Sequence, residues 1–400
     1  MNKLIHNLRT NTILKKTLEA FVKIMSLVYL FFIPSFSARY PFNYIGYVLF
    51  GILTIIVFIY IYLYDKFIIK TEFLFLPIFG VLTFVSTLFG SHEFRRWMTT
   101  LIMTLSFLIM ILIYKIIDDR KKMIKLFVIG MTLFSIYFVV IYFPELSNIS
   151  NFSNMRLGDY FDNVNQVGFY FCFGAIFALY LALFGNSLRD KVYYFLFIIF
   201  LFLGFTTGSR TTLICLFVGV LGLFIIRFKD RKVMLSIILA SLTISIVLLF
   251  NLPFMATLKD RFLSFFETIR GDDVEGSTIQ RLLWQEYGYY FGLKNLFLGL
   301  GEYGFAVFSG VGTYTHGDFP EILCNFGIFG FCTYYGLFVF LGSRALQKRD
   351  KQSLFAIIII ILYLFLGFLG VNYYNKITPY ILAIISCLSQ DSHDYIKLNI

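Results

Sequence analysis

The sequence predicts an all-α protein that crosses a membrane eleven or twelve times and carries one large outer loop with short helices. Three observations lead to this fold class. The 400 residues are 59% hydrophobic and only 14% charged, with a mean hydropathy of +0.80, which excludes an ordinary soluble domain. Apolar runs close to bilayer length recur along the chain. A single long polar stretch interrupts them.

The apolar runs place the expected spans and divide the chain into three parts. We expect spans near residues 18–38, 43–64, 73–90, 97–117, 123–143, 165–185, 191–207, 209–227, 232–250, 322–342, 353–371 and 377–389. The last run is the shortest, so the number is eleven or twelve. Residues 1–250 would hold the first nine spans, residues 251–321 the large outer loop, and residues 322–400 the C-terminal spans, within a single membrane domain.

Lysine sets the expected orientation of these spans. Every second connection is rich in lysine, and placing those connections inside assigns 23 of the 34 basic residues to the cytoplasmic side. This agrees with the positive-inside rule and puts the N-terminus in the cytoplasm. The net charge of +11 is then mostly topological. Because the basic residues are scattered over short loops, they do not indicate a nucleic-acid partner.

Arginine departs from this rule. Three outer lysines are accompanied by eight of the fifteen arginines, namely Arg39, Arg95, Arg96, Arg156, Arg210, Arg261, Arg270 and Arg281. The planar guanidinium suits bidentate phosphate binding, whereas lysine is a point charge. We interpret Arg39, Arg95 and Arg96 as boundary anchors. The remaining arginines predict an outer face that holds a phosphate-bearing substrate.

The long loop contains recognisable elements. Residues 257–270 place their apolar side chains on one face and predict an amphipathic helix at the membrane surface, which includes Arg261 and Arg270. The capping box that starts at Ser277 predicts a second helix near 278–293. By their three- and four-residue spacing, one face of that helix carries Arg281, Trp284, Gln285 and Gly288. A glycine-rich stretch follows, which cannot form regular helix.

Four basic groups are expected to converge at the outer face: Arg156, Arg210, Arg281 and His316. Arg210 follows Gly208-Ser209 at the start of a span, where helix N–H groups and the guanidinium would face one anion; it could also be an interfacial anchor. Arg281 could bind the anion or pair with a loop carboxylate. His316 suits a general base, and a structural histidine is the alternative.

Other residues are candidates for substrate binding. Asn165 opens a span just after the Arg156 segment. Trp284 and Tyr303 are well placed to stack on a sugar ring. Asp318 lies two residues after His316, although an N-cap role for Asp318 with Glu321 explains it better than catalysis does.

No metal site or cofactor is expected. The five cysteines lie in apolar runs without metal-ligand spacing, and we interpret them as buried hydrophobes. The earlier outer loop contains no paired-acid metal motif, although Asp159 and Asp162 could bind a metal. No nucleotide-binding loop occurs, which argues against an ATP-driven pump.

At these residues the chain resembles the O-antigen ligase and polysaccharide polymerase (Wzy-type) family of integral membrane proteins. The resembling segments are Arg156-Leu157-Gly158 with Asn163-Val164-Asn165-Gln166-Val167-Gly168, Thr207-Gly208-Ser209-Arg210-Thr211, and the stretch from Ser277 through Gly301 and His316 to Gly330. They cover about residues 156–342. Two positions depart from the family pattern: Val164 replaces a usual proline, and Gly317 replaces an asparagine that often follows the histidine.

The resemblance implies a GT-C-like glycosyltransferase architecture with its active site under the large outer loop. It implies an undecaprenyl-pyrophosphate-linked oligosaccharide as donor. Arg210 and Arg281, with Arg156 less securely aligned, would bind the pyrophosphate. His316 would activate the acceptor hydroxyl.

These features predict a metal-independent, inverting glycosyl transfer in which His316 is the base and the arginines stabilise the pyrophosphate leaving group. We expect a polymerase of O-antigen or capsule repeat units in a bacterial inner membrane, because the residue usage suggests an AT-rich genome, typical of surface-sugar gene clusters. A ligase acting on a lipid A core is the alternative. A chain-length regulator and a flippase are candidate partners. A flippase function is a third possibility, but it would require charges at mid-span, and the runs carry few.

Overall fold

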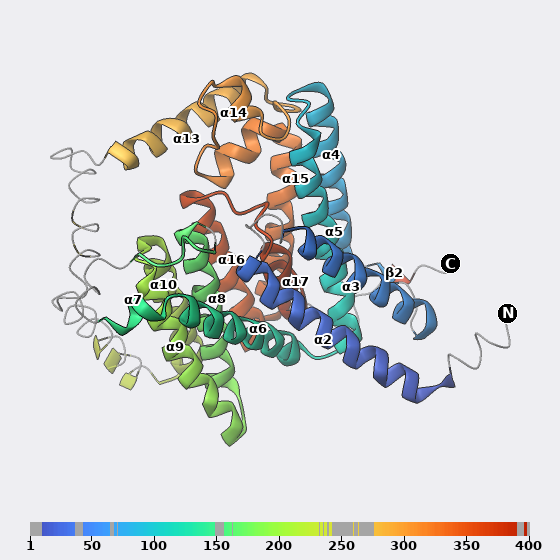
Figure 1. The fold of residues 1–400 in the computed structure, drawn as a ribbon, viewed down its shortest axis with the longest axis vertical. Coiled ribbons are helices and arrows are strands. Elements are labelled where there is room, and N and C mark those ends of the chain that lie inside the picture. Colours follow the sequence, from blue (N-terminus) through green and yellow to red (C-terminus); the bar gives the residue numbers. More distant parts are fainter. Residues whose placement is uncertain are drawn as a thin grey trace. The chain divides into compact units, whose positions relative to one another are not determined.

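The computed structural model describes residues 10–36, 43–64, 68–69, 71–148, 156–161, 163–231, 233–234, 236–237, 240–241, 259, 263, 276–389 and 396–397. Over these residues the protein is all-α, apart from a two-residue antiparallel pairing of β1 (Ile68–Ile69) with β2 (Ile396–Lys397) (Figure 1). The predicted fold class is confirmed at this level. Apart from residues 259 and 263, the predicted amphipathic helix at 257–270 lies outside the described residues, as do Arg39 and the aspartate at 162.

Eight helices of the described residues are long and apolar enough to cross a membrane. They are α2 (Thr12–Phe36), α3 (Asn43–Tyr64), α5 (Phe94–Ile117), α6 (Arg120–Ile141), α8 (Val164–Phe184), α10 (Arg210–Phe228), α15 (Asp318–Lys348) and α16 (Lys351–Leu369). Each coincides with a predicted span.

Three further predicted spans correspond to shorter helices. They are α4 (Phe75–Phe89), α9 (Val192–Thr206) and α17 (Thr378–Ser389), with 15, 15 and 12 residues. At 1.5 Å per residue, such helices fall short of the roughly 30 Å apolar core of a bilayer. The predicted span at 232–250 lies mostly outside the described residues. The described part of the chain therefore supports eight full-length spans, fewer than the eleven or twelve predicted.

The chain divides into two compact units that alternate along the sequence. Unit 1 comprises Met1–Val22, Thr54–Asp118 and Gly276–Ile400, and unit 2 comprises Lys23–Leu53 and Asp119–Glu275. The large-loop helix and His316 belong to unit 1, whereas Arg156 and Arg210 belong to unit 2.

In unit 1, α15 is the central element and packs against α4, α13 (Gly276–Lys294) and α16. The helix is broken at Gly327, whose backbone (φ 62°, ψ −167°) is not helical. The incoming segment 296–301 occupies the break, and Leu300 N–H donates to Cys324 O at 2.9 Å. The break therefore fixes the glycine-rich stretch of the large loop onto the first turns of α15.

In unit 2, α8 is the central element. Its most apolar 18 residues are 94% buried, and its neighbours include α6, α9 and α10. Small residues permit this close packing. A Cβ on Gly168 would lie 2.1 Å from Thr212 Oγ1 on α10, so only glycine fits there. The start of α8 is thereby held against the start of α10, the helix that Arg210 begins.

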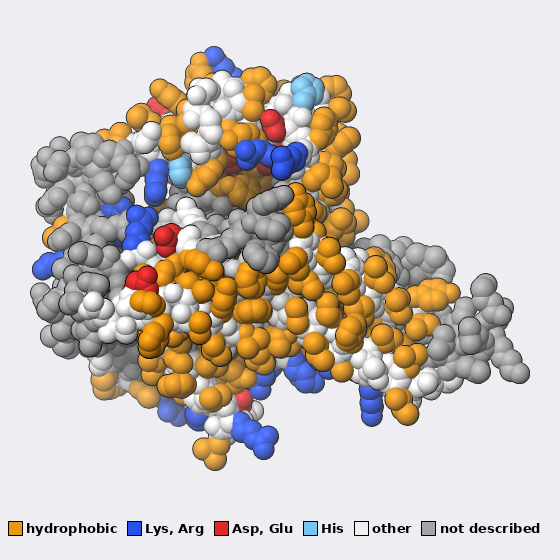
Figure 2. Space-filling model, viewed as in Figure 1, with side chains coloured by type: hydrophobic (Ala, Val, Ile, Leu, Met, Phe, Trp, Pro, Cys, Tyr) orange, Lys and Arg blue, Asp and Glu red, His pale blue; other side chains and the backbone are white. Residues whose placement is uncertain are grey.

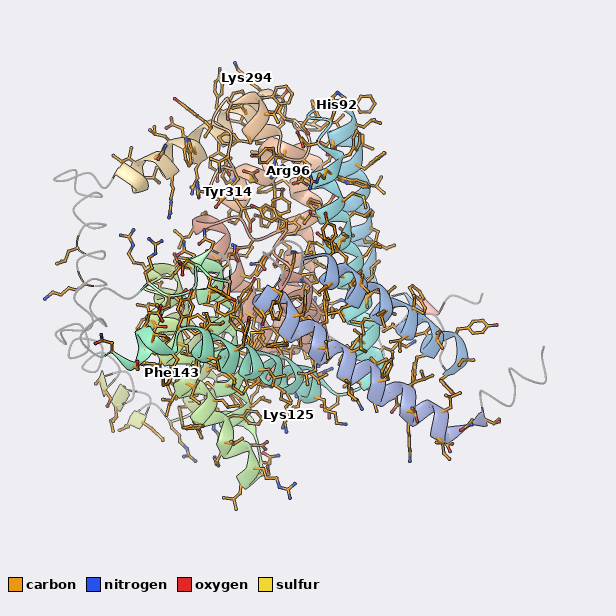
Figure 3. All side chains as sticks on the ribbon, in the orientation of Figure 1. His92, Arg96, Lys125, Phe143, Lys294 and Tyr314 are labelled. Atoms are coloured by element: carbon orange, nitrogen blue, oxygen red, sulfur yellow. The ribbon has the colours of Figure 1, made fainter. Side chains whose placement is uncertain are left out.

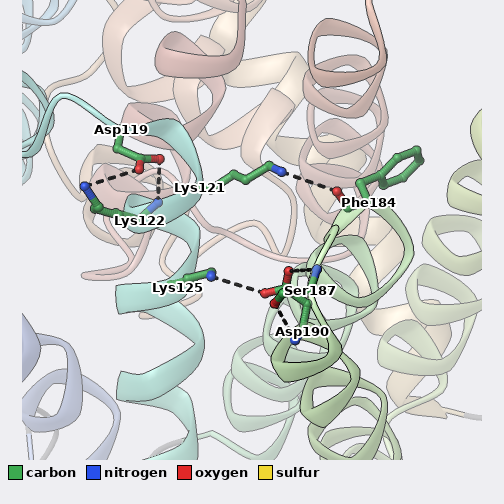
Figure 4. A network of polar contacts seen from close by, with 7 residues as sticks. All are labelled: Asp119, Lys121, Lys122, Lys125, Phe184, Ser187 and Asp190. Atoms are coloured by element: carbon green, nitrogen blue, oxygen red, sulfur yellow. Dashed lines mark hydrogen bonds and ion pairs between the residues drawn. The ribbon is translucent and has the colours of Figure 1, made fainter.

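Polar contacts close the predicted cytoplasmic ends of α6 and α8 (Figure 4). Asp190 and Ser187 form a reciprocal capping box before α9, and Lys125 Nζ lies 3.3 Å from Asp190 Oδ1. The Ser187 N–H and, in smaller part, the lysine lower the pKa of Asp190. Lys121 Nζ donates to the carbonyl of Phe184 at the end of α8, 3.3 Å away. Lys121 thus stabilises the C-terminal end of α8, where helix carbonyls favour a positive charge.

Large apolar side chains cover much of the surface (Figure 2). On α3, Val48 and Ile55 are about 60% exposed, and on α6 Val140 is 64% exposed. Contiguous apolar surface of this extent would aggregate in water and suits contact with lipid. α3 also has the lowest share of burial among the candidate spans, 33%, and α6 is less than half buried, at 44%.

Candidate active site

The large-loop helix α13 carries one functional face. The helix spans Gly276–Lys294, close to the predicted 278–293, and Figure 1 shows it beside α14 (Gly304–Phe308) and the start of α15. Trp284 stacks on His316, Gln285 hydrogen-bonds the same loop, and Gly288 packs against Thr315. The predicted shared face of α13 is confirmed, and it faces the loop before α15.

His316 is held between two aromatic rings. Its imidazole lies parallel to Trp284, with centroids 5.1 Å apart and 13° between the planes, and 4.3 Å from the ring of Tyr314. Figure 3 labels Tyr314. Burial, followed by the positive charge of Arg281, lowers the pKa of His316 to about 4. The imidazole is therefore neutral near pH 7 and able to accept a proton.

A buried carboxylate holds the backbone beside His316. Glu321 is 2% exposed, and its Oε2 accepts a hydrogen bond from Thr315 N–H at 2.7 Å. Its other oxygen accepts from Asn325 Nδ2 at 2.8 Å. Thr315 Oγ1 in turn donates to Gly317 O at 2.9 Å. The loop is thus fixed on both sides of the histidine by side chains of α15 and by its own threonine.

Asp318 does not cap α15 as the sequence suggested. The N-cap residue is Gly317, without a side-chain cap, and Asp318 is the first residue of the helix. The cause is a different set of donors: Asp318 Oδ1 accepts from the N–H groups of Asn372 at 2.6 Å and Tyr373 at 3.1 Å. Asp318 is 1% exposed. Its carboxylate therefore ties the start of α15 to the turn after α16, and a substrate-binding role for it stays a prediction.

Sequence reasoning missed a buried acid, Glu302. Its carboxylate accepts from Thr100 Oγ1 at 2.7 Å and from Tyr373 OH at 2.8 Å, and its N–H donates to Thr87 Oγ1 at 2.9 Å. Burial raises the pKa of Glu302 to about 7, although these hydrogen bonds and Arg96 oppose the shift. The available signal was an acid directly after Gly299-Leu300-Gly301, an unusual place for a charge in an apolar chain.

Arg96 contacts the functional loop and is not simply a boundary anchor. Its guanidinium carbon lies 3.5 Å from the ring centroid of Tyr303, a cation–π contact. Arg96 is labelled in Figure 3. Tyr303 OH donates to Gly312 O at 2.8 Å, and its backbone is left-handed with φ 60°. Like Trp284, Tyr303 therefore has one ring face occupied by a protein group. Sugar stacking on Trp284 or Tyr303 stays a prediction, and a sugar would have to stack on the other face of each ring.

In unit 2, the Arg156 segment is tied to the region of Arg210. Leu157 N–H donates to Thr206 O at 3.0 Å, so the irregular segment 156–158 lies beside the end of α9. Arg156 is exposed and Arg210 is half-buried. The structure thereby places Arg156 and Arg210 on neighbouring segments of one unit.

Tyr142 organises the turn that follows Arg156. Its hydroxyl accepts from the N–H groups of Gly158 and Tyr160, both at 2.9 Å, and donates to Asp159 Oδ1 at 2.7 Å. Burial and the Asp159 carboxylate raise the pKa of Tyr142 to about 12, so the phenol keeps its proton. One side chain thus satisfies three polar groups of this turn.

Arg210 is the first residue of α10, as predicted. Ser209 is the N-cap, and its Oγ accepts from Thr212 N–H at 3.4 Å. The first turn of α10 carries no acidic residue, and its N–H groups and the guanidinium therefore add their positive potential. Asn165 opens α8, where its N–H donates to Asn163 Oδ1 at 2.9 Å. These features suit an anion, which is the chemistry predicted for Arg210.

The structure brings Arg281, Trp284 and His316 together in unit 1, and Arg156, Asn165 and Arg210 occur in unit 2. Within the described ranges, no three His, Cys, Asp or Glu side chains are grouped so as to hold a metal ion. The arrangement in unit 1 offers a neutral imidazole that feels the positive charge of Arg281. The arrangement in unit 2 offers a guanidinium at a helix N-terminus. Both are suited to chemistry on a phosphate ester.

A comparison with protein families gives a match in the second half of the chain. Residues 195–335 match the family model described as O-antigen ligase. That segment includes Arg210, Arg281, Glu302 and His316, whereas Arg156 and Asn165 precede it. No curated protein matches the chain. Over residues 195–335, about a third of its length, this multi-pass membrane protein is therefore similar to the O-antigen ligase family.

Proposed function

We propose that this protein is a polysaccharide polymerase that transfers a glycan from undecaprenyl pyrophosphate to a hydroxyl of a lipid-linked repeat unit. The family supports the coarser statement, a membrane enzyme that acts on lipid-linked glycans. The single observation that carries the proposal is the uncharged His316 imidazole, stacked on Trp284 of the helix face that also carries Arg281. A neutral base and a phosphate-binding cation are the two groups that this transfer requires.

His316 acts as the general base in this proposal. The acceptor hydroxyl attacks the anomeric carbon of the donor while the imidazole removes its proton. The bond to the pyrophosphate oxygen breaks as the new glycosidic bond forms, so the configuration at the anomeric carbon inverts. A pKa of about 4 makes the free base weak. The charge of a bound pyrophosphate opposes that of Arg281 and raises the basicity when donor is present.

Arg281 stabilises the leaving group, and Arg210 of unit 2 is retained from the sequence prediction as a second pyrophosphate-binding residue. The pyrophosphate gains negative charge in the transition state, and a guanidinium can bind two of its oxygens at once. Arg210 adds the N-terminus of α10 to its own charge. Arg156, on the neighbouring segment, is a further contact for the same group. Because these cations can neutralise the charge, the proposed reaction requires no metal ion.

Polymerase and ligase differ in the acceptor. We favour a polymerase because the residue usage suggests an AT-rich genome, which is typical of surface-sugar gene clusters. We place the protein in a bacterial inner membrane, with its N-terminus in the cytoplasm and the site on the outer face. A flippase would need charges along a central path, and the apolar helices are nearly free of them.

The test is a reconstituted reaction with purified protein and one lipid-linked repeat unit. A ladder of longer lipid-linked products supports the polymerase. Product that appears only after a lipid A core acceptor is added would instead show the ligase. Activity that disappears with EDTA and returns with a divalent ion would contradict the metal-free mechanism.

A further inference from the structure

We propose that Gln285 is the positioning residue that holds His316 in its working orientation. Its side-chain amide bridges the backbone of the histidine to the end of α16. The bridge would be made from α13, the same helix that presents Trp284 and Arg281. The geometric part of this inference stands by itself, and its catalytic consequence rests on the proposed role of His316 as base.

The backbone of His316 is strained, so contacts from other residues must stabilise its conformation. Its φ is +63°, in the left-handed region that residues other than glycine adopt at a cost. Such a conformation persists only where the surroundings determine it. The neighbouring hydrogen bond from Thr315 N–H to Glu321 fixes the residue before the histidine, but it does not reach the carbonyl of His316.

Gln285 supplies the contact to that carbonyl. Its Nε2 donates to His316 O at 3.2 Å and to Phe368 O, at the end of α16, at 3.1 Å. A primary amide carries two N–H donors on one nitrogen, so it can serve both carbonyls at once. An apolar side chain of equal length would leave both carbonyls without this donor.

Gly317 makes the close approach of Gln285 possible. A Cβ at Gly317 would lie 3.2 Å from both Cδ and Nε2 of Gln285, which is tighter than ordinary contact. The amide therefore lies against bare backbone immediately after the histidine. This also gives a physical reason for the glycine that departs from the family pattern at this position.

The bridge fixes the relation between the base and the anion-binding arginine. Gln285 is one helical turn after Arg281, and Trp284 between them stacks on the imidazole at 5.1 Å. Loss of the bridge frees the loop to turn the ring away from this stack, while Arg281 stays on its helix. We expect the turnover number to fall more than donor affinity.

Trp284 provides a readout that does not depend on activity. The chain has two tryptophans, and Trp97→Phe leaves Trp284 as the only one. A protonated imidazole quenches the fluorescence of a stacked indole, so lowering the pH titrates His316 directly. In the Trp97→Phe background the emission should fall with a midpoint near the pKa of about 4.

Gln285→Met is the test variant, and Gln280→Met, at an exposed position on the same helix, is the matched control. We expect Gln285→Met to move the quenching midpoint toward the ordinary histidine value of about 6.5, since a released ring is hydrated. We also expect its kcat to fall about ten- to a hundred-fold, with a smaller change in donor KM. Gln280→Met should change neither quantity. If Gln285→Met does not fold, Gln285→Asn, which keeps the donors but is too short for both carbonyls, should shift the midpoint in the same direction.

The positioning role would be overturned if the quenching midpoint of Gln285→Met equalled that of Gln280→Met, even if the kcat of Gln285→Met were lower. A shifted midpoint with an unchanged kcat would leave the positioning role intact. It would instead refute His316 as the base, so the two failures are distinguishable.

Discussion

The His316 region of unit 1 and the Arg210 region of unit 2 are built in contrasting ways. Around His316, buried carboxylates and aromatic rings surround the functional group, and Glu302, Asp318 and Glu321 are each at most 5% exposed. Around Arg210, a serine cap, a phenol and close glycine packing shape the backbone instead. In both regions some supporting side chains bind backbone N–H groups: Asp318 accepts from Asn372 and Tyr373, and Tyr142 accepts from Gly158 and Tyr160.

The difference fits the two chemical tasks proposed for these regions. A base must be neutral near pH 7, and burial against Trp284 with a nearby cation keeps His316 neutral. An anion-binding arginine must remain charged and reachable, and a half-buried site at a helix N-terminus provides that. The comparison predicts that variants in unit 1 act through protonation and orientation, and that variants in unit 2 act through charge.

The largest effect is expected for His316→Ala. Loss of a general base should lower kcat about 10²- to 10⁴-fold, measured as new glycosidic bonds formed in the reconstituted reaction. The control is His92→Ala, at an exposed histidine before α5. In the wild type, kcat/KM should rise with pH through about 4, the pKa of the free enzyme, because the neutral imidazole is the active form. Full activity in His316→Ala would end the base assignment.

Arg210→Lys and Arg281→Lys should each lower kcat about ten- to a hundred-fold, because lysine keeps the charge but cannot bind two phosphate oxygens at once. Arg95→Lys, exposed in the first turn of α5, is the control. The measurement is the rate of lipid pyrophosphate release at saturating donor. Lysine variants as active as the wild type would show that charge alone is sufficient and would remove the bidentate argument.

Glu302→Gln should change how stability depends on pH. The folded pKa of about 7 exceeds the ordinary 4.5, so the folded state binds more protons between these values. The stability of the wild type therefore falls as the pH rises from about 4.5 to 7, by up to about 3 kcal/mol. Because glutamine cannot ionise, the thermal unfolding temperature of Glu302→Gln should depend less on pH over this window. The control is Glu93→Gln, at a less buried glutamate, which should keep the pH dependence of the wild type. An unchanged slope in Glu302→Gln would contradict the burial argument.

Tyr142→Phe should have the smallest effect on catalysis and a moderate one on stability. It removes the acceptor of two backbone N–H groups and the donor to Asp159, which should cost about 1–3 kcal/mol. Tyr193→Phe is the control because its ring would keep its position under Lys125 Nζ, 5.7 Å away. Thermal unfolding in detergent measures the difference. Equal midpoints for the two variants would show that the turn needs no phenol.

Local patterns made part of the site predictable. The face of α13 follows from the helical period of Arg281, Trp284, Gln285 and Gly288, and the structure confirms it. The start of α10 at Arg210 follows from the glycine and serine that precede it. Both depend on residues within a few positions of one another, where sequence spacing and three-dimensional spacing are equivalent.

Long-range contacts were not predictable from the sequence alone. Thr100 and Glu302 are 202 positions apart, and nothing local to either residue indicates their hydrogen bond. The contact of Arg96 with Tyr303 is of the same kind. Span lengths were overestimated because an apolar run can continue beyond its helix: α4 has 15 residues within a predicted span of 18. The cap assignment of Asp318 was wrong for the same reason: its carboxylate accepts hydrogen bonds from the backbone N–H groups of residues 372 and 373, which are distant in the sequence.

The most direct test of the proposed mechanism is the anomeric configuration of the newly formed glycosidic bond, determined by NMR on product made from a donor of known configuration. A single displacement assisted by His316 predicts inversion at the anomeric carbon. Retention would require a covalent glycosyl intermediate on a protein nucleophile and would contradict the mechanism proposed for this site.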